Sequence, residues 1–337
     1  MAGVMAFVLA GCGQPRSGAP RPVLGGPPVV SGSSKVVPGA SSAVGASAPS
    51  SAAPPLATGA TIGVAALECR RDATFPATLA VAEASAAAEV ELTPGAREML
   101  VVSDSGGNGA AAAWRLPSGP ARALRLPLDD AASDDLEGMA WRGGTLYTLT
   151  SSGAVREFVA DGRGGLSRSR DSYRIAQAPL SCEDLRAGNC EKNFEGLCLR
   201  RAGATSKPTR CDGYAASKAR SALYCVVLDR GSGRLRIDGA APLDLPLAPN
   251  ALSDCAFGAE GSAAEDVLLI TTNIYGGSRT FFVDEASGSL QSVAIPGTLN
   301  NEAVAVDKDG MLYELMDDNG SPSFAARYAC TGWPAHP

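Results

Sequence analysis

Five acidic residues recur along the chain, each at or just before a short apolar run. They are Glu83, Glu137, Glu195, Asp254 and Glu302. A charged carboxylate beside a buried strand is unfavourable unless a cation or hydrogen-bond donors compensate it. Carboxylate oxygens are the ligands that Ca²⁺ and Mg²⁺ prefer in proteins. If the five side chains converge, the sequence predicts a metal site with Ca²⁺ as its cofactor.

The same acids have a second interpretation that needs no metal. Each carboxylate could accept hydrogen bonds from backbone N–H groups of a neighbouring sheet and hold two sheets together. A further set of aspartates follows the second apolar runs, namely Asp104, Asp229, Asp317 and Asp318. Because aspartate caps turns readily, we interpret this second set as turn residues. Convergence of the carboxylates would favour a metal site. Hydrogen bonds from backbone N–H groups to every carboxylate would instead favour the second interpretation, in which the acids are clips between sheets.

The acids are part of a repeat. A turn and a second apolar run follow each acidic run, for example GGTLYTLTSSG after LEGMAW and DGMLYELMDDNG after NNEAVAV. The five copies are spaced near or slightly above the length of a propeller blade, about 40–50 residues. Helical periodicity is nearly absent, and glycine and aspartate turns punctuate the chain. The pattern predicts an all-β, five-bladed β-propeller, or a six-bladed one if residues 160–190 hold a further blade. First strands line the channel of a propeller, so the acids would ring one mouth.

The last copy is incomplete, which predicts how the ring closes. SFAARYAC at 323–330 supplies a third strand, and TIGVAAL at 61–67 can supply the fourth from the N-terminal end. Cys69 follows that strand and Cys330 ends its neighbour, so we expect a Cys69–Cys330 disulfide worth about 2–5 kcal/mol. Cys182 and Cys190 are expected to close a short loop. The four that remain, Cys198, Cys211, Cys225 and Cys255, are left to pair among themselves.

The first sixty residues indicate export and anchoring. Residues 1–12 read as a lipoprotein signal peptide whose lipobox, LAGC, ends at Cys12, the expected lipidation site. Residues 13–60 are rich in Pro, Ser, Ala and Gly and predict a disordered linker to a propeller domain at 61–333. Gly13 stands where an aspartate would favour inner-membrane retention, so we expect the lipid anchor to lie in the outer membrane. We also expect the protein to be a monomer.

Composition excludes several classes of chemistry. His336 is the single histidine and lies in the tail, which argues against a Ser-His-Asp triad and a histidine-ligated zinc site. The sequence contains no basic stripe with interleaved aromatic residues, so nothing in it indicates nucleic-acid binding. One loop does gather cations, and Arg200, Arg201 and Arg210 are its candidates for binding a phosphate or another anion. The alternative is a solvated insertion held by disulfides.

The repeated motifs also resemble a known family. DLEGMAW, NFEGLCL, REMLVVSDSG and NNEAVAVDKDGMLYELMDDNG resemble the phytase-like, esterase-like lipoprotein propellers and the related SdiA-regulated family. The resemblance implies an exported propeller with acidic, often Ca²⁺-dependent, residues at one face, and phosphoester or ester hydrolysis. Glu302-Ala303 lacks the glycine of the pattern, and Asp254-Cys255 departs at both positions.

Two functions follow from these observations. The first is a cell-envelope lipoprotein whose propeller binds a protein or small-molecule ligand across its loops. The second is a metal-dependent hydrolase of phytase-like type, which requires the acids to converge with room for water and a cation nearby.

Overall fold

The computed structural model describes residues 67–75, 78–104, 107–128, 135–176, 194–203, 210–273, 277–295, 300–316 and 322–334. Secondary structure in these ranges consists of β-strands grouped into five antiparallel sheets. None of the residues described forms a helix that could cross a membrane. The predicted signal peptide, lipidation site Cys12, linker 13–60 and the pair Cys182 and Cys190 lie outside the described residues.

Each sheet is one blade of a five-bladed β-propeller. Blade 1 contains β3 (Ala84–Thr93), β4 (Ala96–Ser103), β5 (Ala110–Arg115) and β6 (Ala121–Arg125). Blade 2 contains β7 (Leu136–Arg142), β8 (Thr145–Thr150), β9 (Ala154–Ala160), β10 (Leu166–Arg168) and β11 (Tyr173–Arg174). Blade 3 contains β12 (Phe194–Leu199), β13 (Gly213–Ser217), β14 (Ala222–Leu228), β15 (Leu235–Ile237) and β16 (Leu243–Asp244).

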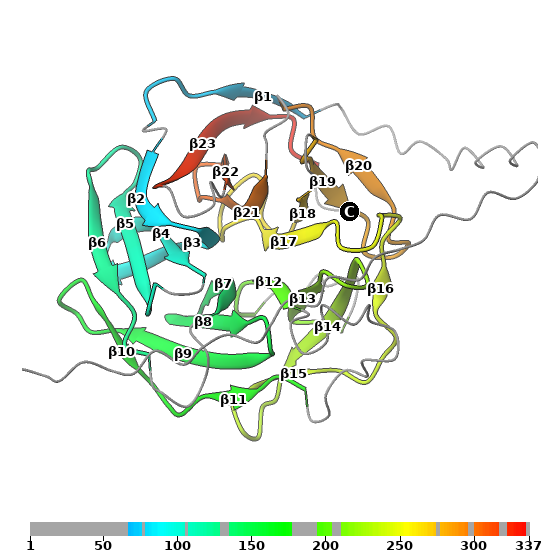
Figure 1. Ribbon diagram of the computed structural model, residues 1–337, viewed down its shortest axis with the longest axis horizontal. Helices are drawn as coiled ribbons and strands as arrows, with labels where there is room; N and C mark the ends of the chain where they lie inside the picture. Colours follow the sequence, from blue (N-terminus) through cyan, green and yellow to red (C-terminus); the bar gives the residue numbers. More distant parts are fainter. Residues whose placement is uncertain are drawn as a thin grey trace, which may run out of the picture. The chain divides into compact units, whose positions relative to one another are not determined.

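The last two blades complete the ring. Blade 4 contains β17 (Leu252–Phe257), β18 (Leu268–Thr272), β19 (Thr280–Val283) and β20 (Leu290–Ser292). Blade 5 contains β21 (Asn301–Val306), β22 (Met311–Met316) and β23 (Pro322–Thr331) from the C-terminal part, with β1 (Glu68–Arg71) and β2 (Thr78–Ala82) paired to β23. Figure 1 shows the first strands β3, β7, β12, β17 and β21 nearest the centre, and β21 contacts β3 to close the circle. The five-bladed prediction is confirmed.

Turn chemistry explains why the strands double back where they do. Arg142 pairs with Thr145, and the two glycines between them, Gly143 and Gly144, have φ values of 57° and 81°. A two-residue hairpin of type I′ needs positive φ at both central residues, which glycine adopts without steric cost. The sequence thereby fixes the register between β7 and β8.

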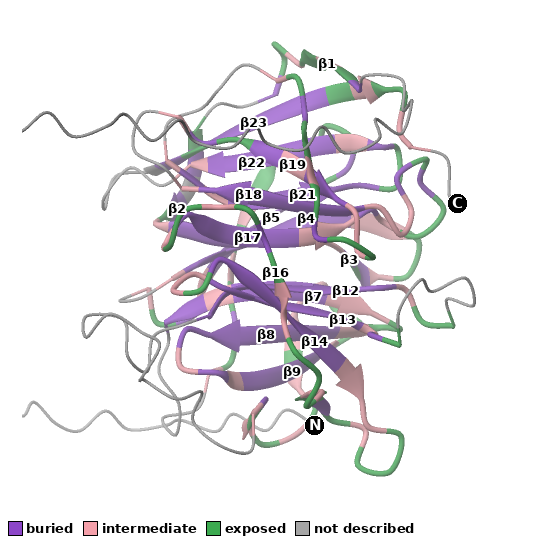
Figure 2. Ribbon diagram, turned by 90° about the vertical axis from the view of Figure 1, so that its right-hand side faces the viewer, coloured by how far each residue is buried: buried purple, intermediate pink, exposed green. Residues whose placement is uncertain are grey.

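The apolar core is divided among the interfaces between blades. Five clusters of buried side chains lie between neighbouring blades, and Figure 2 shows the buried strands stacked through the domain. On β3, Ala87 packs with Tyr313 of blade 5, whereas Ala86 packs with Leu136 of blade 2. Successive residues of a strand point to opposite faces, so each first strand supplies two interfaces. Blade-to-blade packing therefore positions the ends of the first strands.

The closure of the ring uses residues slightly further along the chain than the sequence predicts. Residues 61–66 lie outside the described residues, within which pairing with β23 begins at Glu68. Cys69 lies opposite Cys330 in this ladder, and the two form a disulfide. The prediction of an N-terminal closing strand is thus confirmed, and the closing strands among the described residues are β1 and β2.

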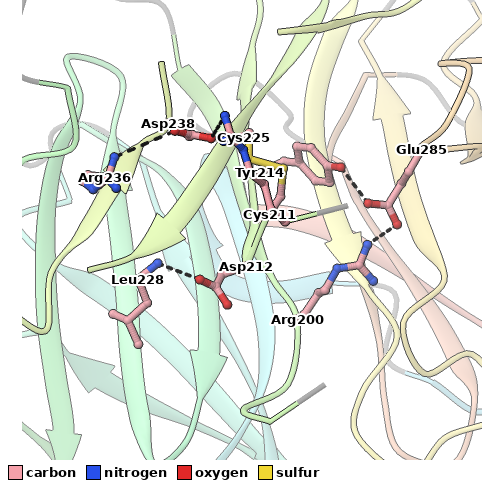
Figure 3. Close-up of a disulfide and its surroundings, with 10 residues drawn as sticks. Arg200, Cys211, Asp212, Tyr214, Cys225, Leu228, Arg236, Asp238 and Glu285 are labelled. Carbon is pink, nitrogen blue, oxygen red and sulfur yellow. Dashed lines mark hydrogen bonds and ion pairs between the residues drawn. A yellow bond between two sulfur atoms is a disulfide. The ribbon is translucent and has the colours of Figure 1, made fainter. Parts of the chain in front are cut away.

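Two more disulfides pair the four cysteines that the sequence left open. Cys198 of β12 bonds Cys255 of β17, which joins blades 3 and 4. Cys211 bonds Cys225 within blade 3, beside Tyr214 (Figure 3). Three disulfides among the described residues indicate an oxidising compartment, which is consistent with export.

Candidate functional site

A β-bulge interrupts the start of every first strand. The register of each first strand shifts by one residue against its second strand, and the additional residues are Ser85, Glu137, Glu195, Ser253 and Glu302. A bulge leaves one residue out of the ladder and re-aims its side chain. Because all five bulges fall at the same end of their strands, they define one mouth of the channel, which we call the acidic mouth.

The bulges hold three glutamates and two serines instead of five acids. Ser85 donates its hydroxyl hydrogen to the carbonyl oxygen of Leu136 at 2.5 Å, and Ser253 donates to the carbonyl oxygen of Asn301 at 2.7 Å. Each acceptor belongs to the first strand of the next blade. The two serines are therefore clips between blades, whereas the three glutamates present carboxyl groups at the mouth.

Two members of the predicted ring lie at other positions. Asp254 stands one residue after the bulge, and its carboxylate accepts hydrogen bonds from the N–H groups of Cys255 and Val304. Glu83 stands two residues before the bulge of β3, with a φ of 49° at the connection from β2. The predicted ring is corrected to Glu137, Glu195 and Glu302. Alignment of the residues before the bulges, such as Leu252 with Leu136, would have revealed the shift.

Three carboxylates converge at the boundary between blades 1 and 2. Asp104 follows β4, Asp135 precedes β7, and Glu137 occupies the bulge of β7; one carboxylate oxygen from each lies within 4.8 Å of the others. The backbone N–H of Leu136 donates to the carbonyl oxygen of Asp104 at 3.4 Å, which holds the two strand ends together. The hydroxyl of Ser151 donates a hydrogen bond to Asp135. Neither Asp104, interpreted as a turn residue, nor Asp135 was expected at this site.

The environment of this cluster opposes ionisation of Glu137. Burial raises the pKa of Glu137 to about 10, and the charges of Glu195, Asp135 and Asp104 act in the same direction. Lys218 has the opposite effect but does not outweigh them. Glu137 is therefore neutral near pH 7 and faces two other carboxyl groups. A cation bound among the three would favour the ionised form of Glu137.

The other two glutamates of the acidic mouth have partners from the ends of second strands. The ammonium group of Lys218, which follows β13, lies 2.9 Å from Glu195. Burial raises the pKa of Glu195 to about 6, against the effect of Lys218. Asn273, which follows β18, donates a side-chain hydrogen bond to Glu302 of blade 5. Among the described residues, the mouth thus combines several carboxylates with the single ammonium group of Lys218.

The residues that end the second strands are the part of the site that sequence reasoning missed. In four blades the residue just before the bulge pairs with the last residue of the second strand. The next residue along the chain is then Asp104, Ser151, Lys218 or Asn273. The repeat itself contained this signal, since the position after each second strand carries a polar residue. Asp229, from the same predicted set, does cap a turn, because its carboxylate accepts the N–H of Gly231 at 2.8 Å.

The three arginines predicted to bind a ligand do not face the acidic mouth. Arg200 and Arg201 follow the far end of β12, and Arg200 is buried with its guanidinium 4.4 Å above the ring of Phe257. Arg200 also pairs with Glu285, which in turn accepts the Tyr214 hydroxyl (Figure 3). Arg201 pairs with Glu265, and Arg210 lies 2.5 Å from Asp238. The prediction that these three arginines serve one exposed ligand site is therefore corrected for Arg200, which is a structural residue between blades 3 and 4.

Comparison with known proteins finds no family match and only distant similarity to solved structures. No protein-family model and no curated protein matches the sequence. Among solved structures, a glutaminyl cyclase from Myxococcus xanthus is similar at 15% identity and a TM-score of 0.45, covering 78% of this chain and 97% of that one. The β-propeller domain of Cps50 (Swd1) from Myceliophteria thermophila is similar at 12% identity and a TM-score of 0.44, covering 78% and 100%. The RRP9 WD40 repeats are similar at 9% identity and a TM-score of 0.41, covering 78% and 97%. Likeness at these identities and TM-scores says nothing of activity.

Proposed function

We propose that the protein is a cell-envelope lipoprotein whose propeller is a binding platform, and that the acidic mouth binds Ca²⁺ as part of the ligand site. The observation that carries this proposal is the convergence of Asp104, Asp135 and Glu137 within 4.8 Å. The finer assignment to the phytase-like and SdiA-regulated propellers belongs to the same proposal.

The donor set fits Ca²⁺. Calcium takes six to eight oxygen ligands in flexible geometry, and three carboxylates supply three to six of them. Water or a ligand would complete the shell from the channel side. The bound cation would also compensate the charge that keeps Glu137 protonated. Hard carboxylate oxygens without histidine or thiolate argue against zinc and copper.

Calcium titration of the purified protein by isothermal calorimetry tests this proposal. We expect one site, a raised melting temperature with Ca²⁺, and loss of that shift with chelator, because a ligand that binds only the folded state stabilises it. Glu137→Gln should weaken binding at least tenfold. Asp171→Asn is the matched control, because Asp171 is fully exposed and lies between the outer strands β10 and β11 of blade 2. Equal binding by wild type and Glu137→Gln would contradict the proposal.

A second candidate function is a metal-dependent phosphoester or ester hydrolase. Lys218 favours it, because a charged ammonium group beside Glu195 and near Glu137 could neutralise a phosphate oxygen. Burial tends to lower the pKa of Lys218, but the neighbouring carboxylates outweigh this and raise it, so the amine stays charged. Hydrolysis of p-nitrophenyl phosphate or acetate that requires Ca²⁺ and is lost in Lys218→Met would establish this function over a binding platform.

The lipid anchor is tested separately from the site. Mass spectrometry of the protein isolated from membranes should find an acylated Cys12 as the first residue. Cys12→Ser should release the propeller from the membrane fraction without changing its Ca²⁺ binding. Fractionation of the two membranes then tests the outer-membrane assignment. Size-exclusion chromatography with light scattering tests the expected monomer.

A further inference from the structure

The opposite end of the channel holds a cavity of about 480 Å³. Its lining includes the far ends of all five first strands, for example Glu91 of β3 and Val306 of β21. The acidic mouth lies at the starts of these same strands, so the two sites occupy opposite ends. A cavity of this size suits a small molecule.

Four cations of the described part of the chain line this cavity, and they come from four blades. They are Arg97, Arg142, Arg201 and Lys308. Glutamates line it as well and pair with some of these cations, as Glu89 does with Arg97. The cavity thus carries both charges. Which groups could bind a ligand depends on which of their donors and acceptors are already used within the chain.

Arg142 is held in place on one side and has an unused donor on the other. Its Nη2 lies 3.0 Å from Oδ1 of Asp212, whose Oδ2 accepts the N–H of Leu228 at 2.8 Å, as Figure 3 shows for Asp212 and Leu228. The Arg142 side chain is only 9% exposed. Its Nη1 is buried and has no hydrogen-bond acceptor among the described residues.

Arg97 of the neighbouring blade shows the same feature. Its Nε pairs with Glu89 and its Nη1 lies 3.2 Å from Asp309, yet its buried Nη2 has no acceptor in the described ranges. A buried cationic donor without an acceptor is unfavourable, and native structures rarely leave one unpaired. Two such donors occur on two residues that line one cavity, so an acceptor supplied by a bound molecule would satisfy both.

We propose that this cavity is an anion site, separate from the acidic mouth, that binds the carboxylate or phosphate group of a small ligand through Arg142 and Arg97. Planar guanidinium groups match the oxygen geometry of both anions. Lys308 is exposed beside them and adds positive charge at the rim. The ion pairs of Arg142 with Asp212 and of Arg97 with Glu89 fix both guanidinium groups before a ligand arrives.

Calorimetric titration of the purified protein with inorganic phosphate and with succinate, at constant ionic strength, tests the proposal. We expect one-site binding of at least one anion, and the anion that binds identifies the ligand class. Arg142→Lys should weaken it about 10- to 100-fold, because lysine can keep the charge opposite Asp212 but lacks the second nitrogen. Arg230→Lys is the matched control, since Arg230 is an exposed turn residue outside the cavity lining.

A second variant protects the test against misfolding of the first. Lys308→Met changes an exposed side chain, so the fold should persist while anion binding weakens several-fold. Absence of binding by wild type to both anions at millimolar concentration would overturn the proposal. Binding that is equal in wild type, Lys308→Met and a folded Arg142→Lys would overturn it as well.

Discussion

The Oδ2 atom of Asp254 accepts a hydrogen bond from the backbone N–H of Val304 at 3.0 Å, across the boundary between β17 and β21. Its Oδ1 atom accepts the N–H of Cys255 at 2.7 Å. Both carboxylate oxygens are therefore used by backbone donors. Burial nevertheless raises the pKa of Asp254 well above its usual range, against the effect of these two bonds. Asp254 thus acts as a clip between blades 4 and 5, as the metal-free interpretation of the acids predicts.

Replacement of this clip should reduce stability without affecting Ca²⁺ binding. Asp254→Ala leaves two buried N–H groups without their acceptor, so we expect a loss of about 2–4 kcal/mol in the free energy of unfolding. Urea denaturation measures this loss. Asp171→Ala, at an exposed position, should change stability by less than about 0.5 kcal/mol. A fall in Ca²⁺ affinity for folded Asp254→Ala would instead place Asp254 in the metal site.

A glycine at the acidic mouth should tolerate no side chain. A Cβ atom on Gly138 would overlap the backbone nitrogen of Leu197 in the next blade. Gly138→Ala should therefore force β7 and β12 apart and lower the melting temperature by several degrees. Gly239→Ala is the control, because no atom lies within 4 Å of a Cβ atom built there. A melting temperature equal to that of wild type for Gly138→Ala would show that the strands can separate freely.

The closing disulfide should contribute more to stability than the one within blade 3. Cys69 and Cys330 are separated by 261 residues in sequence, whereas Cys211 and Cys225 are separated by 14. In the chain-entropy account a longer closed loop constrains the unfolded state more, about 5 against 3 kcal/mol. Thermal melting of Cys69→Ser/Cys330→Ser and of Cys211→Ser/Cys225→Ser compares the two. A larger loss in the second variant would contradict this account.

The fold was accessible from the sequence because each blade repeats the same local rules. Strand–turn–strand patterns and glycines such as Gly143 specify hairpins by local chemistry alone. The closing pair of Cys69 and Cys330 followed from counting strands. The bounds of the closing strands were less accessible, because their pairing with β23 depends on contacts between chain segments far apart in sequence.

The acidic site was only partly accessible, because its geometry depends on one-residue shifts. The bulges place Glu137 and Ser253 at equivalent positions. Asp254, one residue later, accepts a hydrogen bond from the backbone of the next blade. Such a shift changes which face a side chain occupies, and composition does not record it. Asp104 reaches the site because the second strand of blade 1 ends beside the first strand of blade 2. Lys218 reaches it because the second strand of blade 3 ends beside the first strand of the same blade.

Stability of the metal-free protein should fall as pH rises. The pKa of Glu137 is about 10 in the folded protein and near 4.5 when unperturbed, so the folded state binds the extra proton between these values. Unfolding is then favoured increasingly from about pH 4.5 to pH 10, and Glu195 contributes only up to about pH 6. Melting in chelator from pH 6.5 to 9 should show this decline, and Ca²⁺ should reduce it by binding the ionised carboxylate. Glu137→Gln has no proton to lose there and should decline less; an identical slope would exclude Glu137 as its source.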